Sequence, residues 1–132
     1  MSNQLKKILV VEDEAFIAMG LRMELTHQGY YQCDIVASGE EAVQLIEKEE
    51  FQLALMDIQL SGKMDGIEAA RKISLRHRIP IVFMTGFPNQ DLKERAKTIN
   101  PIAWFDKPIA IEELKRVIEE AFTLAPLGER AG

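Results

Sequence analysis

A chain of 132 residues is expected to form one domain, and its 47% hydrophobic and 28% charged residues are ordinary for a soluble globular protein. The formal net charge of -5 argues against a general nucleic-acid-binding surface, so direct DNA binding is not expected. The single cysteine excludes an internal disulfide. No apolar stretch reaches the ~18 residues of a membrane span, and residues 1–7 lack the apolar core of a signal peptide. Together these features indicate a cytoplasmic protein.

Five short apolar runs mark the predicted strands, because such runs are typical of strands buried on both faces of a parallel sheet. In chain order they span residues 6–11, 32–36, 52–56, 79–84 and 102–105. A helical pattern follows each run. Ser38 and Glu41 form a capping box for the second helix, and Asp65 caps the third. The fourth helix, residues 89–99, is polar with a thin apolar face, and the last spans residues 110–122.

This alternation predicts an α/β fold, because alternating strands and helices of this length form a parallel sheet with helices on both faces. A flavodoxin-like (βα)5 arrangement with the strand order 2-1-3-4-5 places the first and third strands side by side and opens a crevice above their carboxyl ends. The domain is expected to span residues 1–124, and residues 125–132 are predicted to be a disordered tail. The methionines are expected to fill the core.

Polar side chains follow four of the predicted strands at the edge where this crevice opens. In chain order they are Glu12, Asp13, Asp57, Thr85 and Lys107. Three close carboxylates repel one another unless a cation lies between them, and hard oxygen ligands in this number suit Mg²⁺. Lys107 can bind phosphate and Thr85 can donate a hydrogen bond to an anionic oxygen. Asp57 is the candidate nucleophile, because carboxylates can form acyl phosphates.

Five short motifs, taken in this order and spacing, resemble those of the response-regulator receiver domain of two-component signalling, as in the chemotaxis-type single-domain regulators. The motifs are Val10-Val11-Glu12-Asp13-Glu14, Met56-Asp57-Ile58, Met64-Asp65-Gly66, Met84-Thr85-Gly86 and Trp104-Phe105-Asp106-Lys107-Pro108. The resemblance covers the chain from about residue 6 to residue 122.

The resemblance implies a chemistry for these positions. Asp57 would accept a phosphoryl group from a phosphohistidine of a sensor histidine kinase or phosphotransfer protein, and Thr85 and Lys107 would bind the phosphoryl oxygens. Mg²⁺ would be held by Glu12, Asp13, Asp57 and the backbone carbonyl of Gln59. Such a domain is no enzyme beyond its own phosphorylation and slow dephosphorylation. The bond between Lys107 and Pro108 is expected to be cis.

The resemblance also implies a switch. Thr85 and Trp104 would couple phosphorylation to a face made of the fourth helix, the fifth strand and the fifth helix, which binds a downstream protein or a second copy. Trp104 stands where the family commonly has tyrosine or phenylalanine. Ser61 stands where it usually has proline, in a loop one residue longer. Val117 and Leu124 replace the dimer-forming arginines of DNA-binding members and would make this face apolar.

Three alternatives remain. A phosphatase of the haloacid dehalogenase type also has an aspartate nucleophile after a strand, but it needs a second aspartate where this chain has Gln59. A flavin- or nucleotide-binding module needs a glycine- or hydroxyl-rich loop after the first strand, where this chain is acidic. The chain can also be a receiver segment of a hybrid histidine kinase or larger regulator, which the sequence leaves open.

Overall fold

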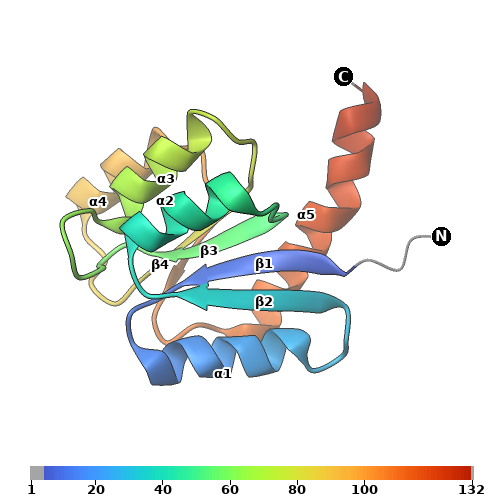
Figure 1. Ribbon diagram of the computed structural model, residues 1–132, viewed down its shortest axis with the longest axis horizontal. Helices are drawn as coiled ribbons and strands as arrows, with labels where there is room; N and C mark the ends of the chain where they lie inside the picture. Colours follow the sequence, from blue (N-terminus) through green and yellow to red (C-terminus); the bar gives the residue numbers. More distant parts are fainter. Residues whose placement is uncertain (1–4, 132) are drawn as a thin grey trace.

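The computed structural model describes the backbone of residues 5–131 and the side chains of residues 5–123. Its sheet has five parallel strands in the order β2-β1-β3-β4-β5, which confirms the predicted fold class and strand order (Figure 1). The strands are β1 (Lys6–Val11), β2 (Tyr31–Val36), β3 (Leu53–Asp57), β4 (Ile81–Thr85) and β5 (Ala103–Asp106).

Five helices cover the two faces of the sheet, with α2, α3 and α4 on one face and α1 and α5 on the other (Figure 1). They are α1 (Ala15–Thr26), α2 (Gly39–Lys48), α3 (Gly66–Ser74), α4 (Gln90–Lys97) and α5 (Ile111–Ala131). The structure thus carries α5 past residue 122, where the sequence pattern ended it. The predicted tail over residues 125–132 falls outside the residues whose side chains are described. Within residues 5–131, no helix is long and apolar enough to cross a membrane.

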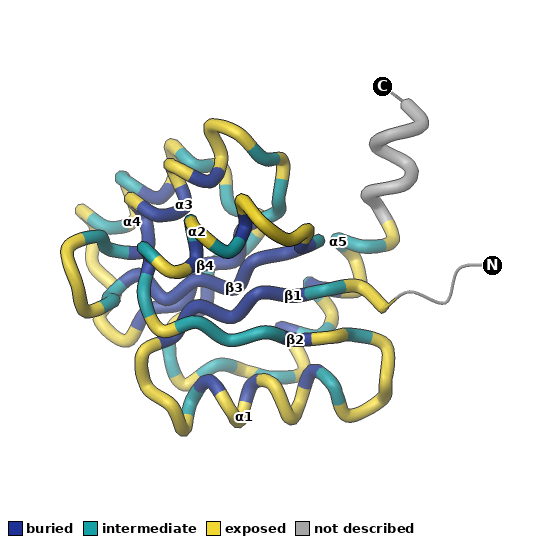
Figure 2. Tube along the Cα trace, in the orientation of Figure 1, coloured by how far each residue is buried: buried dark blue, intermediate teal, exposed yellow. Residues whose placement is uncertain are grey.

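The core consists of two layers, one on each face of the central strands. Every residue of β3 and β4 is buried, because helices cover both faces of the sheet (Figure 2). Leu9, Ala54 and Phe83 face the layer under α2, α3 and α4, whereas Leu55 and Val82 face the layer under α1 and α5. The buried centre of the sheet therefore ends at the edge that carries Asp57.

Helix caps fix the loops around this edge. Ser38 accepts a hydrogen bond from the Glu41 backbone N–H at 3.1 Å, as predicted, but the Glu41 carboxylate accepts from Ala37 at 2.9 Å and so does not close a reciprocal box. The reciprocal box is at α3, where the Asp65 and Glu68 side chains accept from each other's backbone N–H at 2.9 and 3.0 Å.

Gly66 lets the start of α3 pass directly behind the end of β3. A Cβ atom at this position would lie 2.0 Å from the carbonyl oxygen of Asp57, so any other residue would force the backbone apart. The Gly66 N–H also donates to the carbonyl of Ile58 at 2.9 Å. The loop after Asp57 is therefore anchored at both of its ends.

Candidate functional site

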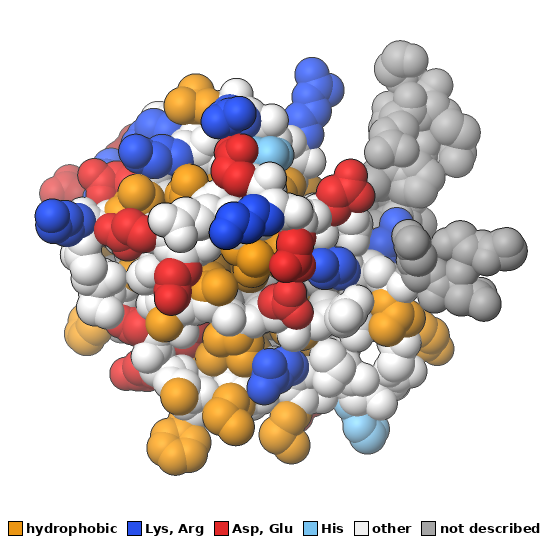
Figure 3. All heavy atoms as spheres, viewed as in Figure 1, with side chains coloured by type: hydrophobic (Ala, Val, Ile, Leu, Met, Phe, Trp, Pro, Cys, Tyr) orange, Lys and Arg blue, Asp and Glu red, His pale blue; other side chains and the backbone are white. Residues whose placement is uncertain are grey.

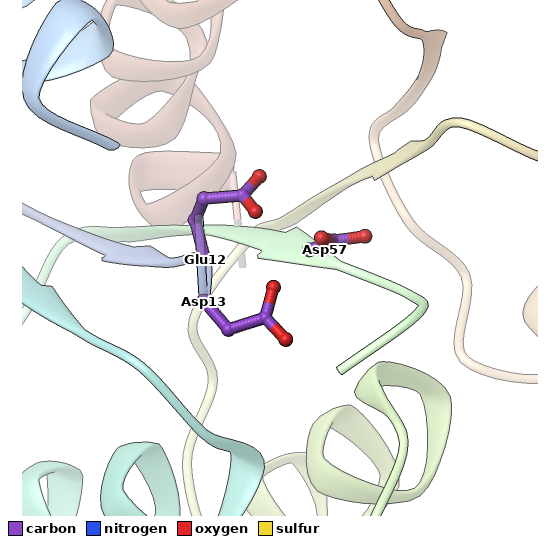
Figure 4. A group of neighbouring side chains, drawn as sticks. All are labelled: Glu12, Asp13 and Asp57. Atoms are coloured by element: carbon purple, nitrogen blue, oxygen red, sulfur yellow. The ribbon is translucent and has the colours of Figure 1, made fainter. Parts of the chain in front are cut away.

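Three carboxylates from two adjacent strands meet at the carboxyl edge of the sheet. Glu12 and Asp13 directly follow β1, and Asp57 is the last residue of β3 (Figure 4). One oxygen from each lies within 4.8 Å of the others. Glu12 and Asp57 are 1% and 2% exposed, whereas Asp13 is open to solvent. The structure thus brings together the three predicted carboxylates, with one accessible side.

Lys107 lies against the two buried carboxylates. Its Nζ donates to Glu12 Oε1 at 2.7 Å and to Asp57 Oδ2 at 3.0 Å. Its backbone N–H donates to the carbonyl of Thr85 at 2.8 Å, which holds the end of β5 against β4. The bond from Lys107 to Pro108 is cis, as predicted. The ammonium group of Lys107 therefore lies beside the Asp57 carboxylate, where it can neutralise negative charge added to that side chain.

Burial and pairing shift the pKa values of Glu12 and Lys107. Burial raises the pKa of Glu12 above 4.5 and outweighs the hydrogen bonds from Lys107 and the Glu14 N–H, which lower it; the nearby Asp57 charge is a smaller raising effect. Burial lowers the pKa of Lys107, but its hydrogen bonds and charge interactions with the two carboxylates together raise that pKa above 10.5. Lys107 is therefore held as a cation at neutral pH.

Thr85, the last residue of β4, is fully buried beside this cluster. Its Oγ1 donates to Oε1 of Gln59 at 2.6 Å and accepts from the Phe87 N–H at 3.0 Å. The Gln59 N–H donates to Asp57 Oδ1 at 3.0 Å. The sequence predicted a role at the site for the backbone carbonyl of Gln59, and none for its side chain. That prediction missed this side-chain contact, because the path of the loop after β3 has no signal in residue spacing.

Residues 8–119 match the family model of the response regulator receiver domain. This chain belongs to that family.

Relatives of this receiver domain agree with the assignment. It is 38% identical over 116 residues to the transcriptional regulatory protein PdtaR of Mycobacterium tuberculosis, with 88% of this chain aligned but only 56% of the relative's length. It is 29% identical to sporulation initiation phosphotransferase F of Bacillus subtilis, over 90% of this chain and 95% of that protein. The structure also superimposes on the receiver domain of the sensor histidine kinase PA1611 of Pseudomonas aeruginosa, with a TM-score of 0.79 and 28% identity over 89% of this chain and 97% of that one. That domain was solved with a magnesium ion in its active-site cleft.

The loop after β3 binds the exposed carboxylate of the receiver site. The Ser61 N–H and Oγ both donate to Asp13 Oδ2, at 3.1 and 3.0 Å. A proline at this position would lack the N–H for the first of these bonds. Farther along the loop, the Lys63 N–H donates to the Glu40 carboxylate at 3.2 Å. The loop is therefore pinned at two points, and one of them orients a candidate metal ligand.

Trp104 lies outside the cluster, half-buried on β5 against the core layer under α2, α3 and α4. Its Nε1 donates to the Asp106 carboxylate at 2.8 Å, and Lys93 Nζ lies 5.6 Å from the centroid of its rings. Val117 is half-buried against the core under α1 and α5, and the side chain of Leu124 falls outside the described residues. Val117 therefore exposes less apolar surface on the predicted output face than the sequence indicated.

Proposed function

We propose that this receiver accepts a phosphoryl group on Asp57 from a phosphohistidine of a histidine kinase or phosphotransfer protein. The metal ligands would be Glu12, Asp13, Asp57 and the backbone carbonyl of Gln59. One observation carries the proposal: the Asp57 carboxylate is almost wholly buried, yet it lies beside an ion-paired ammonium and two further carboxylates at the carboxyl edge of the sheet. Beyond this reaction and the slow hydrolysis of the acyl phosphate, which releases inorganic phosphate and restores the Asp57 carboxylate, we propose no enzymatic activity.

In this reaction a carboxylate oxygen of Asp57 bonds to phosphorus while the bond from phosphorus to the donor's ring nitrogen breaks. The nitrogen keeps the electron pair of that bond and takes up a proton. Lys107 neutralises charge on the transferred group, and the Thr85 hydroxyl donates to one of its oxygens. Bound Mg²⁺ would supply further neutralisation and orientation, and three clustered carboxylates of which one is exposed are a donor set that suits it.

Phosphorylation by acetyl phosphate, a small donor that needs no partner, tests this proposal. We expect the protein to incorporate one base-labile phosphoryl group when Mg²⁺ is present and none in EDTA. A protein that remains unlabelled in saturating Mg²⁺ would contradict the proposed function.

The context of the domain remains a matter of proposal. The chain spans 56% of the length of PdtaR but 95% of the Bacillus protein, and the PA1611 domain is part of a histidine kinase. A stand-alone phosphotransfer receiver and a receiver within a larger regulator or hybrid kinase therefore both fit. The proposed phosphorylation of Asp57 is the same in both contexts.

Removal of the exposed carboxylate is expected to weaken metal binding and to stabilise the metal-free protein. Asp13→Ala takes away one ligand, and loss of a ligand's supporting group alone costs about 10–100-fold in affinity. It also relieves repulsion from Glu12 and Asp57, so the melting temperature in EDTA is expected to rise by on the order of a few degrees. Thermal melts with and without Mg²⁺ measure both effects. Glu50→Ala removes the same charge from an exposed site and serves as the control.

An Asp13→Ala protein that melts earlier than wild type in EDTA, and still gains as much from Mg²⁺, would show that Asp13 is no ligand.

A stripe of exposed apolar side chains on α1 suits the phosphodonor. Phe16 and Met23 are 92% and 71% exposed and lie on one face of the helix with Met19, so these two methionines do not fill the core as predicted. Figure 3 shows hydrophobic side chains gathered in the region of α1. A groove of about 330 Å³ is lined by residues that include Phe16 and Lys107. We propose that the donor protein covers this stripe, because its phosphohistidine must reach Asp57.

Phe16→Gln is expected to slow transfer from the partner at least about tenfold, since apolar anchors dominate such interfaces. Labelling by acetyl phosphate is expected to be unchanged, because Phe16 touches none of the reacting groups. Leu75→Gln, at an 80% exposed position at the end of α3, is the matched control. Equal partner-dependent rates for wild type and Phe16→Gln would place the donor elsewhere.

On the output side, we propose that phosphorylation alters the face formed by α4, β5 and α5 through Thr85 and Trp104, for a downstream protein or a second copy. Beryllofluoride with Mg²⁺, a mimic of the phosphoryl group, is expected to change the fluorescence of Trp104, the only tryptophan. The change is expected to disappear in Thr85→Ala. Unchanged fluorescence in a wild-type protein that binds beryllofluoride would make Trp104 a static residue.

A further inference from the structure

The hydroxyl hydrogen of Thr85 is already engaged in the resting protein. A threonine hydroxyl has one hydrogen to donate, and here it points to the amide oxygen of Gln59 at 2.6 Å. The Phe87 N–H occupies the acceptor side of the same oxygen at 3.0 Å. Thr85 is fully buried, so water cannot supply a substitute acceptor. Any other acceptor of this hydrogen must displace Gln59.

Gln59 is also tied to the nucleophile. Its backbone N–H donates to Asp57 Oδ1 at 3.0 Å, while Asp57 Oδ2 pairs with Lys107 at 3.0 Å. Gln59 thus bridges the two residues: its backbone N–H bonds to Asp57, and its side chain bonds to Thr85. The acceptor that phosphorylation introduces would arise on Asp57, at the other end of this bridge.

We propose that Gln59 is the positioning residue that holds Thr85 in the resting state, and that its amide oxygen competes with a phosphoryl oxygen for the hydroxyl hydrogen of Thr85. The inference rests on the proposed function, since it takes Asp57 as the phosphoryl acceptor. The strength of the Gln59 contact then sets how readily the protein adopts its activated state.

The direction of the competition follows from charge. A phosphoryl oxygen is anionic and accepts a hydrogen bond about twice as strong as that of a neutral amide, so activation can break the resting contact. Removing the amide leaves the buried hydroxyl of Thr85 without an acceptor only in the resting state. That state alone is destabilised, and the activated state becomes more populated.

The backbone contacts around Gln59 do not depend on its side chain. Its N–H would still donate to Asp57, and the Phe87 N–H and the Lys107 N–H would still hold Thr85 through its hydroxyl oxygen and its carbonyl. Gln59→Met keeps the length of the side chain without the amide oxygen. Gln59→Glu keeps an acceptor and makes it a stronger one, which also repels an anionic group on Asp57.

Calorimetric titration with beryllofluoride in saturating Mg²⁺ tests the proposal without reliance on Trp104. Relative to wild type, we expect Gln59→Met to bind up to about tenfold more tightly, the range of one net hydrogen bond, and Gln59→Glu to bind more weakly. In a Thr85→Ala background, the change from Gln to Met is expected to have no effect, because the contact is already absent.

Equal affinities for wild type and Gln59→Met, or an equal gain in the Thr85→Ala background, would overturn the role of Gln59 and leave the proposed function intact. A wild-type protein that binds no beryllofluoride would overturn both. Gln59→Leu provides a second variant without the amide should the Met variant fold poorly, and thermal melts of each protein monitor that.

Discussion

The Asp57→Asn protein is expected to accept no phosphoryl group from any donor while it keeps its fold. An amide oxygen is a far weaker nucleophile than a carboxylate. The change is nearly isosteric, and the amide oxygen can still accept from the Gln59 N–H. Labelling by acetyl phosphate in Mg²⁺, followed by intact-protein mass spectrometry, measures the loss. Asp34→Asn, on β2 away from the site, is the control.

Full labelling of Asp57→Asn would place the nucleophile at another residue. A loss of labelling accompanied by a loss of helical signal in circular dichroism would not support the prediction, because the variant must fold for its inactivity to identify Asp57.

Lys107→Met is expected to lower the free energy of unfolding by about 3 kcal/mol at neutral pH, because it leaves two buried carboxylates without their partner. Among the residues whose side chains are described, Lys107 is the cation that the structure pairs with Glu12 and Asp57, and it is itself only 16% exposed. Phosphorylation is expected to fall as well. Lys115→Met, which breaks a surface pair with Glu24 at 3.4 Å, is the control and is expected to cost less than about 1 kcal/mol.

The difference between wild type and Lys107→Met is expected to depend on pH. The pKa of Glu12 is raised in the folded state, so its contribution to stability is present below 4.5 and is lost as pH rises through the folded pKa. In Lys107→Met the pKa of Glu12 rises further, so the free energy of unfolding continues to fall up to a higher pH than in wild type. The raised pKa of Lys107 gives wild type a contribution that is present below 10.5 and lost above it. Denaturant titrations should therefore show the largest difference near neutral pH and a smaller one below 4.5. A difference independent of pH would contradict an electrostatic origin.

The sequence was sufficient for the parts of this structure that depend on the order of elements. Asp57, Thr85 and Lys107 each stand at the end of an apolar run, and parallel strands bring such ends to one edge. The contacts of Ser61 with Asp13 were beyond the sequence, because a hydroxyl and an N–H in a loop meet a carboxylate only through the backbone path between them. The same holds for the Gln59 side chain.

Helix faces were harder to assign than strand ends. The stripe of Ile17, Leu21 and Leu25 on α1 predicts the buried face, but the chain carries a second apolar stripe through Phe16 and Met23 that lies in solvent. Periodicity alone does not distinguish a stripe that packs on the sheet from one left for a partner. The position of the sheet determines which of the two stripes is buried.

The central claim, that Asp57 takes up the phosphoryl group in a Mg²⁺-dependent reaction, is tested most directly by mapping the labelled residue. Wild-type protein treated with acetyl phosphate is quenched with borohydride, which reduces an acyl phosphate to an alcohol, and its peptides are analysed by mass spectrometry. We predict a single modified residue, Asp57, in samples with Mg²⁺ and no modification in samples with EDTA. Modification at a different residue, or an Asp57 that remains unmodified in saturating Mg²⁺, would contradict the account.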